Sequence, residues 1–248
     1  MRDRVLAILT AGAVTLGLVG PMMALGTTAS ADGCYTWPRT LRQGMSGDDV
    51  RRLQIRVAGW AAYHDFVAID GAFGAETTSA VKRFQRGYGL TDDGIAGPQT
   101  YNKIYALQDA DCTPIHFSYA EFADCRGGFS GGAVSEAKVR SNLLRLMWKL
   151  EALRHKLGNS PVTITSGFRS YACNTGVSNS QHLYGTAADV VVSGYTLCGI
   201  INNGPKTSGF SGIIGPPDPD HRDHVHLDSR AENNDDGITN GYYWYFNC

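Results

Sequence analysis

The sequence predicts an α+β fold class, in which a small all-α module of three helices precedes an α+β domain with an antiparallel sheet. Three observations predict it. Two Asp-Gly-x-x-Gly turns, 23 residues apart, each precede a helical pattern. One long helical pattern follows them. After it come short segments in which apolar and polar residues alternate, as is typical of strands.

Residues 1–31 have the composition of a signal peptide and are excluded from the fold. Arg2 and Arg4 precede an apolar run over residues 5–25, and Ala29-Ser-Ala31 offers small residues to a signal peptidase. The small residues that follow the apolar run favour cleavage, and therefore secretion, over an uncleaved membrane anchor. The apolar run is long enough for such an anchor, so the alternative stays open at this point.

The remaining length suits two modest domains, at residues 34–112 and 113–248. The chain is nearly neutral, with 22 Lys and Arg against 23 Asp and Glu, which gives no electrostatic case for binding nucleic acid. Beyond the signal peptide no apolar run is long enough to span a membrane, so we expect no span in the mature chain. A monomer is the default expectation.

The six cysteines are scattered, and none forms a Cys-x-x-Cys pair. An even number of scattered cysteines in an exported chain indicates disulfides rather than a zinc cage. Many pairings are open to six cysteines. We favour neighbours in sequence, because that choice keeps each bridge within one predicted domain. The favoured bridges are Cys34–Cys112, Cys125–Cys173 and Cys198–Cys248.

The first domain contains three helix candidates. The opening one fits residues 46–58, with Ser46 as its N-cap. The other two follow the turns at 70–74 and 93–97, where glycine supplies backbone angles that other residues resist. Pro98 suits the first turn of the later helix.

Over roughly residues 40–106 the chain resembles the peptidoglycan-binding module of cell-wall hydrolases, a small three-helix domain. Many positions carry the resemblance, in order: Leu41, Gly44, Gly47, Val50, Leu53, Gln54, Asp70-Gly71, Phe73-Gly74, Thr77, Ala80-Val81, Phe84-Gln85, Gly89-Leu90, Asp93-Gly94 and Gly97-Pro98. The resemblance implies binding to peptidoglycan; the alternative is a structural module without a ligand. Tyr88 and Trp60 are candidate contacts, although aromatic side chains more often lie in a core.

The second domain opens with a helix over residues 135–157, in which Val139 and five leucines recur at spacings of three and four. Ser135 can cap its start and Gly158 can end it. Three strand-like segments follow: Val162–Thr165, Ala187–Val192 and His224–Leu227.

The first chemical motif is Ser180-Gln-His182-Leu-Tyr-Gly185-Thr-Ala187-Ala-Asp189. On a helix His182 and Asp189 could share a face, but Gly185 and the β-branched run after Asp189 favour a hairpin or a loop followed by a strand. The chain would then turn at Gly185 and return Asp189 to His182. An aspartate at the head of an apolar strand is costly to bury unpaired, and a metal or another cation offsets that cost.

The second motif is His221-Arg-Asp223-His224-Val-His226. In a strand His224 and His226 project to the same side, so either could bind a metal together with the first motif. Zinc accepts imidazole nitrogen and carboxylate oxygen, and a catalytic site keeps one position for water. Bound zinc lowers the pKa of that water to about 7, and a nearby carboxylate can take its proton.

Together the two motifs, SxHxxGxAxD and DHxH, resemble the zinc D-Ala-D-Ala carboxypeptidase family, and the resemblance covers most of residues 113–248. It implies a secreted, wall-associated zinc peptidase that hydrolyses the terminal D-Ala-D-Ala bond of peptidoglycan stem peptides. It also implies that Zn²⁺ is bound by three residues, His182, Asp189 and His226.

The resemblance implies further roles around the metal. Asp223 matches the general base, and Arg169, in Gly-Phe-Arg-Ser, matches an arginine that binds substrate and polarises its carbonyl. His221 and His224 match histidines that line the site. Each has a structural rival: Asp223 and His224 could only orient their neighbours, His221 could be an exposed loop residue, and Arg169 could be an ion-pair partner.

Two rival functions remain open in the sequence. One is an endopeptidase of the same zinc chemistry that cuts cross-bridges or an L-alanyl-D-glutamate link, because the loops around a site set the choice of bond. The other is a non-catalytic wall-binding protein, against which the complete motif argues.

Overall fold

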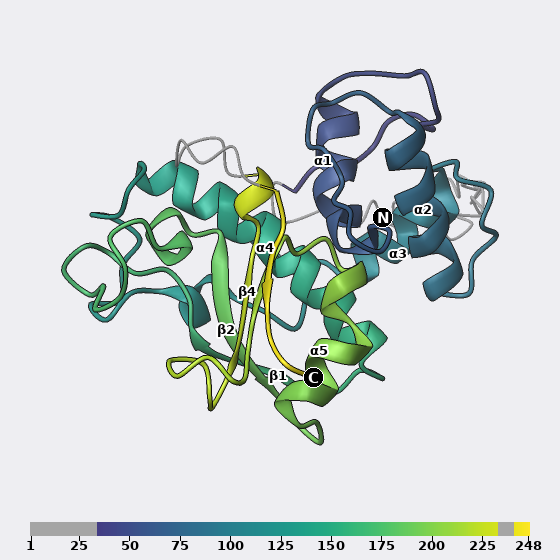
Figure 1. Cartoon of the computed structure of the whole chain (residues 1–248). Coiled ribbons are helices and arrows are strands. Elements are labelled where there is room, and N and C mark those ends of the chain that lie inside the picture. The colour runs from purple at the N-terminus through teal and green to yellow at the C-terminus, as the bar shows by residue number, and fades with distance from the viewer. Residues whose placement is uncertain (1–33, 233–240) are drawn as a thin grey trace, which may run out of the picture. The chain divides into compact units, whose positions relative to one another are not determined.

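A computed structural model of the chain describes residues 34–232 and 241–248 (Figure 1). The predicted signal peptide, residues 1–31, lies outside the described residues. Among the helices in the two described ranges, none is both long and apolar enough to cross a bilayer. All three predicted disulfides are present, Cys34–Cys112, Cys125–Cys173 and Cys198–Cys248.

The amino-terminal module consists of three helices, as predicted: α1 (Asp48–Val57), α2 (Ala75–Gly87) and α3 (Pro98–Ala106). Pro98 is the first residue of α3, so that prediction is confirmed. The predicted N-cap of α1 was wrong by one residue, because Gly47 takes that position. Gly47 has a φ of 145°, which favours glycine, and its carbonyl accepts a hydrogen bond from the amide of Arg51.

The repeated turns of the module are two copies of one hydrogen-bonded network, each organised by a buried glutamine. In the first copy the side-chain oxygen of Gln54 accepts from the amide of Gly71 at 2.8 Å. The Gln54 amide donates to Asp70 Oδ1 at 2.8 Å and approaches Thr77 Oγ1 at 3.1 Å. The glutamine thereby fixes the turn against α1 and α2.

Gln85 does the same for the second turn. Its oxygen accepts from the amide of Gly94 at 2.9 Å, and its amide lies 3.0 Å from Asp93 Oδ1 and 3.1 Å from Thr100 Oγ1. The matching distances show that the two Asp-Gly-x-x-Gly turns belong to one repeated structural unit and are more than two similar loops.

The long helix α4 (Glu136–Lys156) joins the module to the rest of the chain. The Ser135 side chain caps it, accepting from the amide of Lys138, as the sequence predicts. Four of its five leucines pack into the core of the second domain, whereas Trp148 and Ala152 belong to the core of the module. One helix therefore serves two cores, and the boundary at residues 112 and 113 stays a prediction.

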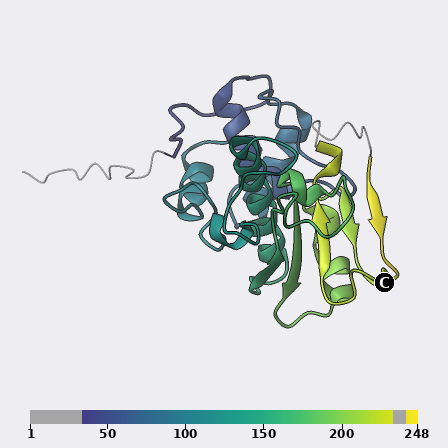
Figure 2. The ribbon, with the colours of Figure 1, turned by 90° about the vertical axis from the view of Figure 1, so that its left-hand side faces the viewer.

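Within the described residues five strands form one sheet, in the order β1-β2-β4-β3-β5. They are β1 (Val162–Ser166), β2 (Ala187–Val192), β3 (Gly212–Ile214), β4 (Val225–Asp228) and β5 (Tyr243–Tyr245). The first three pairings are antiparallel, as predicted, but β3 and β5 pair in parallel, so the sheet is mixed. Figure 2 shows β5 in yellow at the edge of the sheet.

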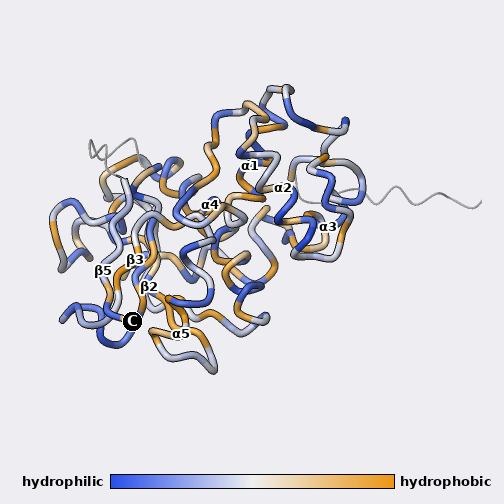
Figure 3. The backbone as a smooth tube through the Cα atoms, turned by 45° about the vertical axis from the view of Figure 1, so that its right-hand side comes forward, coloured by the Kyte–Doolittle hydropathy of each residue, from blue (hydrophilic) through white to orange (hydrophobic). Residues whose placement is uncertain are grey.

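The strand that pairs in parallel is the last one, β5. β5 is tethered from beyond its end by Cys248, which is bonded to Cys198 in helix α5 (Leu197–Asn203). The apolar side chains of β2, β3 and β4 pack with α4 in one core, and Figure 3 shows orange, hydrophobic stretches along the central strands. This core holds β2 and β4 side by side, and these two strands carry the residues of the site.

Candidate metal centre

Asp189 and His226 face each other across the two central strands. β2 and β4 are antiparallel neighbours, and Asp189 and His226 are partners in their register. His224 lies outside β4, which begins at Val225, so the prediction that His224 and His226 share one strand was wrong. The strand pairing brings together two residues that are 37 positions apart in sequence.

His182 reaches the same place from a short 3-10 helix, η3 (Gln181–Tyr184). Gly185 ends that helix with a left-handed φ of 69°, and β2 begins two residues later, which confirms the predicted loop followed by a strand. A Cβ at Gly185 would lie 2.9 Å from the Val139 side chain, so glycine is required for space as well as for its backbone angle.

Three potential ligand atoms converge between these elements. His182 Nε2 lies 3.2 Å from Asp189 Oδ1, and His226 Nδ1 lies 2.9 Å from the same oxygen. The two ring nitrogens are 3.2 Å apart. All three side chains are buried. Ligand atoms about 2.0 Å from a tetrahedral metal lie about 3.3 Å from one another. The spacing therefore fits one face of a tetrahedral zinc site, and the donors are those zinc accepts.

Neighbouring acceptors orient the two rings. The carbonyl oxygen of Gly167 lies 2.6 Å from His182 Nδ1, so Nδ1 carries the proton and Nε2 keeps its lone pair toward the cluster. On the other ring, Nε2 of His226 lies 3.0 Å from Asp228 Oδ2, and Nδ1 faces the cluster. The two histidines thus present different nitrogens to the same point.

The protonation of the cluster follows from burial and from its neighbours. Burial lowers the pKa of His182. Burial alone would raise the pKa of Asp189, but hydrogen bonds and charge from His182 and His226 hold it far below its usual range. Burial opposes the charged form of His226, yet the hydrogen bonds to Asp189 and Asp228 raise its pKa to about 9. Asp189 is therefore ionised at neutral pH, and its buried charge favours a neighbouring cation.

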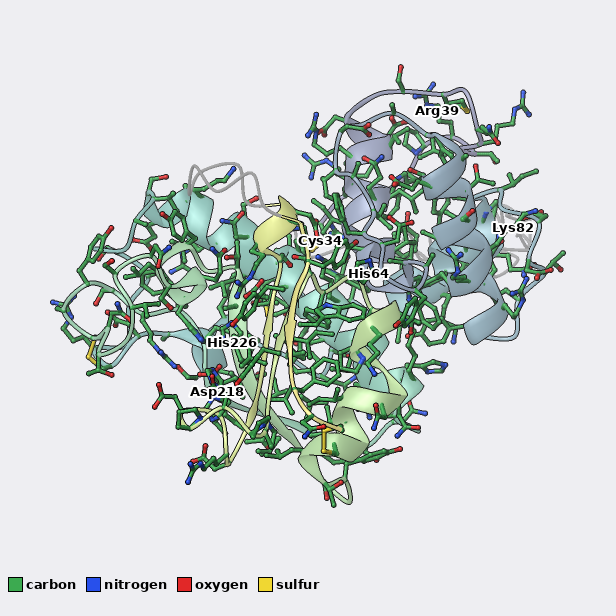
Figure 4. All side chains as sticks on the ribbon, in the orientation of Figure 1. Cys34, Arg39, His64, Lys82, Asp218 and His226 are labelled. Atoms are coloured by element: carbon green, nitrogen blue, oxygen red, sulfur yellow. A yellow bond between two sulfur atoms is a disulfide. The ribbon has the colours of Figure 1, made fainter. Side chains whose placement is uncertain are left out.

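A cavity of about 610 Å³ opens onto the three residues. Six of the seven site residues predicted from sequence line it: His182, Asp189, His226, Arg169, His221 and His224. The seventh, Asp223, is absent from the lining, and its side chain is 91% exposed. Figure 4 shows that His226 and Asp218, which holds His221, lie close together near the end of the sheet.

Arg169 is fixed at the edge of the cluster. Its Nη2 donates to Asp189 Oδ2 at 2.6 Å, and its Nε donates to the Ser166 hydroxyl at 2.9 Å. The arginine is thus an ion-pair partner of Asp189 and also lines the cavity. A guanidinium has five N–H donors, so these two contacts do not exhaust its capacity toward a substrate.

Two carboxylate–histidine pairs stand beside the cluster. Asp223 Oδ1 accepts from Nδ1 of His224 at 2.7 Å, and the other ring nitrogen of His224 lies 3.6 Å from Asp189 Oδ1. Asp218 Oδ1 accepts from Nδ1 of His221 at 2.7 Å. Asp189, His221 and His224 also form a second, overlapping group of potential ligand atoms. Asp223 therefore reaches the cavity through the ring of His224.

Sequence reasoning missed Asp228 and Arg230. Asp228 is completely buried, contacts His226 and is bound in turn by Arg230 at 2.5 Å. A signal for Asp228 was present, because it lies two residues after His226 and so shares its face of the strand. Arg230 follows the strand and carried no such signal.

The comparisons with known proteins agree with this geometry. The family described as Peptidase M15 matches residues 115–228, and the family described as a putative peptidoglycan binding domain matches residues 46–104. The zinc D-Ala-D-Ala carboxypeptidase of Streptomyces albus G is 48% identical over 92% of this chain and 94% of its own length.

Two further relatives match a smaller part. The N-acetylmuramoyl-L-alanine amidase CwlM of Mycobacterium tuberculosis is 37% identical over 39% of this chain and 24% of its own length. A probable N-acetylmuramoyl-L-alanine amidase of Bacillus licheniformis is 36% identical over 39% of this chain and 31% of its own length. Identity of 48% over nearly the whole of both chains is decisive. The chain belongs to the Peptidase M15 family of zinc metallopeptidases, alongside the zinc D-Ala-D-Ala carboxypeptidases.

Proposed function

We propose that this protein is a D,D-carboxypeptidase that removes the terminal D-Ala from peptidoglycan stem peptides. The observation that carries the proposal is the convergence of His182, Asp189 and His226 at the floor of an open cavity. Their spacing supports a zinc site with three protein ligands, and the cavity leaves room for water and a peptide. The name of the Streptomyces albus G relative supports the choice of bond.

The proposed ligand set prefers His226 over His224. His226 Nδ1 lies 2.9 Å from Asp189 Oδ1 and 3.2 Å from His182 Nε2, whereas His224 Nε2 is 3.6 Å from Asp189. When bound, zinc supplies a Lewis acid that polarises a carbonyl and makes water reactive near neutral pH.

The chain's own residues supply binding and proton transfer. Arg169, held by Asp189 and Ser166 at the cavity wall, donates hydrogen bonds to the substrate carbonyl. The Asp223–His224 pair accepts the proton of the attacking water and returns it to the leaving amine. His224 faces the cluster, and Asp223 holds its other nitrogen, so the pair acts as a unit.

Elemental analysis of purified variants tests the ligand set. We expect His182→Ala and His226→Ala to lose zinc, because each removes one of three donors. Full zinc occupancy in either variant contradicts the assignment.

The base is tested by kinetics. We expect Asp223→Ala to keep its zinc and lose most of its activity. If the pair acts as a unit, His224→Ala loses a similar factor in kcat, and the double variant loses little more. Wild-type turnover by Asp223→Ala refutes the role. If the loss of kcat in the double variant equals the product of the two single losses, Asp223 and His224 have independent roles instead.

The amino-terminal module is proposed to bind peptidoglycan and so to raise the local concentration of substrate. The predicted signal peptide and the proposed target support a secreted, wall-associated protein. An endopeptidase of the same chemistry is the second candidate, since the metal residues are common to both. Mass spectrometry of digested muropeptides separates them: loss of a single terminal alanine supports the carboxypeptidase, and cut cross-links support the endopeptidase.

A further inference from the structure

The orientation of His226 depends on a buried carboxylate that no motif includes. Asp228 is 0% exposed, and its Oδ2 lies 3.0 Å from Nε2 of His226. An ionised carboxylate can only accept a hydrogen bond, so the proton of the ring belongs on Nε2. Nδ1 is then the nitrogen with a lone pair available to a metal, and Nδ1 is the atom that faces His182 and Asp189.

Asp228 is itself held in place from three sides. Arg230 donates from Nε to both carboxylate oxygens at 3.0 Å, and from Nη2 to Oδ2. The backbone amide of Arg230 donates to Oδ1 at 2.9 Å. On the neighbouring strand, a Cβ at Gly212 would lie 2.2 Å from both Asp228 oxygens, so the absence of a side chain there leaves room for the carboxylate. The buried carboxylate of Asp228 is therefore paired with Arg230 and confined to one position.

The other histidine shows why this support matters. His182 is oriented by a backbone carbonyl, at Gly167, which bonds its Nδ1 and leaves Nε2 for the cluster. His226 needs the opposite nitrogen to face the cluster, and no backbone carbonyl bonds its Nε2 among the described hydrogen bonds. A side-chain carboxylate takes that place, and it adds a negative charge that a neutral carbonyl does not supply.

From this geometry, and building on the proposed function, we propose that Asp228 is a positioning residue of the metal centre. It keeps the proton of His226 on Nε2 and aims Nδ1 at the point where His182 and Asp189 converge. The negative charge of Asp228 also makes His226 a stronger electron-pair donor to a metal, because a carboxylate partner raises the basicity of a ligating imidazole. Arg230 and Gly212 act through Asp228, by fixing its position.

Zinc affinity, measured by competition with a chelator, tests the proposal. Loss of a partner that orients a metal ligand weakens metal binding about 10- to 100-fold, which we expect for Asp228→Ala. Asp228→Asn keeps an oxygen that can accept from Nε2 but loses the charge, so its affinity should fall between those of the wild type and Asp228→Ala. Asp218→Ala is the matched control, because it removes a carboxylate from a histidine outside the ligand set; its zinc affinity should stay at the wild-type value.

The melting temperature of each metal-free variant shows whether a loss of zinc affinity reflects a loss of stability. Arg230→Gln breaks the ion pair but leaves the Asp228–His226 hydrogen bond, so it should weaken zinc binding less than Asp228→Ala does. A purely structural Asp228 predicts equal losses of affinity in both variants, and that result overturns the proposal.

The wild-type protein offers a second measurement that needs no folded variant. In ¹⁵N-labelled, zinc-loaded protein, the two-bond nitrogen–proton correlations of His226 should show a protonated Nε2 and a metal-bound Nδ1. The opposite assignment overturns the proposal.

His226→Ala separates failure of the inference from failure of the proposed site. If His226→Ala loses zinc while Asp228→Ala binds it as tightly as the wild type, the ligand set stands and the role of Asp228 falls. If His226→Ala binds zinc normally, the ligand set itself is wrong, and the inference falls with it.

Discussion

At the residue scale, the site depends on single polar atoms that are buried and have defined partners. His182 and His226 present different nitrogens because Gly167 and Asp228 accept from the others. The same principle operates far from the metal, where Gln54 and Gln85 each satisfy a turn amide. Burying a polar group is tolerable only when its hydrogen bonds are made, so these partners decide both conformation and stability.

The paired glutamines give a quantitative expectation. Gln54→Ala and Gln85→Ala should each lower the free energy of unfolding by about 1–3 kcal/mol, because each leaves a turn amide and a threonine without their buried partner. The two losses should be similar, since the two networks have the same contacts. Chemical denaturation measures them, with the exposed Gln43→Ala as the control. A loss in one variant only would show that the networks are not energetically equivalent.

The buried side chain of Lys156 should make the free energy of unfolding depend on pH. Burial, and then the charge of Arg83, lower its pKa from 10.5 to about 7. Between these values the unfolded chain binds more protons than the folded chain, so the lysine's contribution to the free energy of unfolding rises with pH. Relative to Lys156→Met, the wild type should gain up to about 1.4 kcal/mol per pH unit within this window. Denaturation of both proteins at pH 7, 8 and 9 measures the gain; a constant difference contradicts it.

At the element scale, α4 is the element that two cores share. Trp148 and Ala152 pack with the module, while Leu150 and Leu153 pack with the sheet. The module meets α4 at the 3-10 helix η1 (Ala58–Trp60). There a Cβ at Gly59 would lie 2.4 Å from the Ala152 Cβ and 2.8 Å from the Lys149 Cα, so only glycine permits the approach.

Gly59→Ala should therefore destabilise the protein. Overpacking of a close contact costs about 1–3 kcal/mol, and here the nearest atoms belong to a helix and cannot move independently. Thermal unfolding measures the effect. Gly241→Ala is the control, because no heavy atom lies within 4 Å of its Cβ position. A melting temperature of Gly59→Ala equal to that of the wild type would mean that η1 and α4 can separate freely.

The elements also show which features the sequence could predict. Hydrophobic periodicity predicted α4, a run that is apolar apart from Asp189 predicted β2, and Gly185 predicted the turn that brings His182 to Asp189. The parallel pairing of β5 was not predictable, because no local pattern states which edge a three-residue strand joins. Asp223 was predicted to act directly, but the structure directs its carboxylate onto His224. The direction of a side chain such as that of Asp223 depends on neighbouring residues, and only the folded chain brings those neighbours together.

At the scale of the whole molecule, the described residues from Cys34 onward cluster as one compact unit. The module and the second domain meet through α4 and through Lys156, whose ammonium donates to the carbonyls of Gly59 and Thr207. A disulfide, Cys34–Cys112, closes the module, and the carbonyl of Cys112 accepts a hydrogen bond from the indole N–H of Trp148 in α4. The module is therefore tied to the catalytic domain by packing as well as by the chain.

A shared core predicts cooperative unfolding. In calorimetry the oxidised protein should unfold in one transition whose calorimetric and van't Hoff enthalpies agree, because exposing Trp148 weakens both cores together. Two resolved transitions would show that the module and the catalytic domain are thermodynamically independent.

In the proposed mechanism, His182, Asp189 and His226 hold one zinc ion that drives removal of a terminal D-Ala. The most direct test is to strip the protein with a chelator, add zinc back in steps, and follow digestion of pentapeptide muropeptides by mass spectrometry. Activity should be absent from the stripped protein, rise linearly and level off at one zinc per chain, with every product shortened by one alanine. Cleavage that persists without metal would contradict the zinc mechanism, and products cut at another bond would contradict the proposed carboxypeptidase activity.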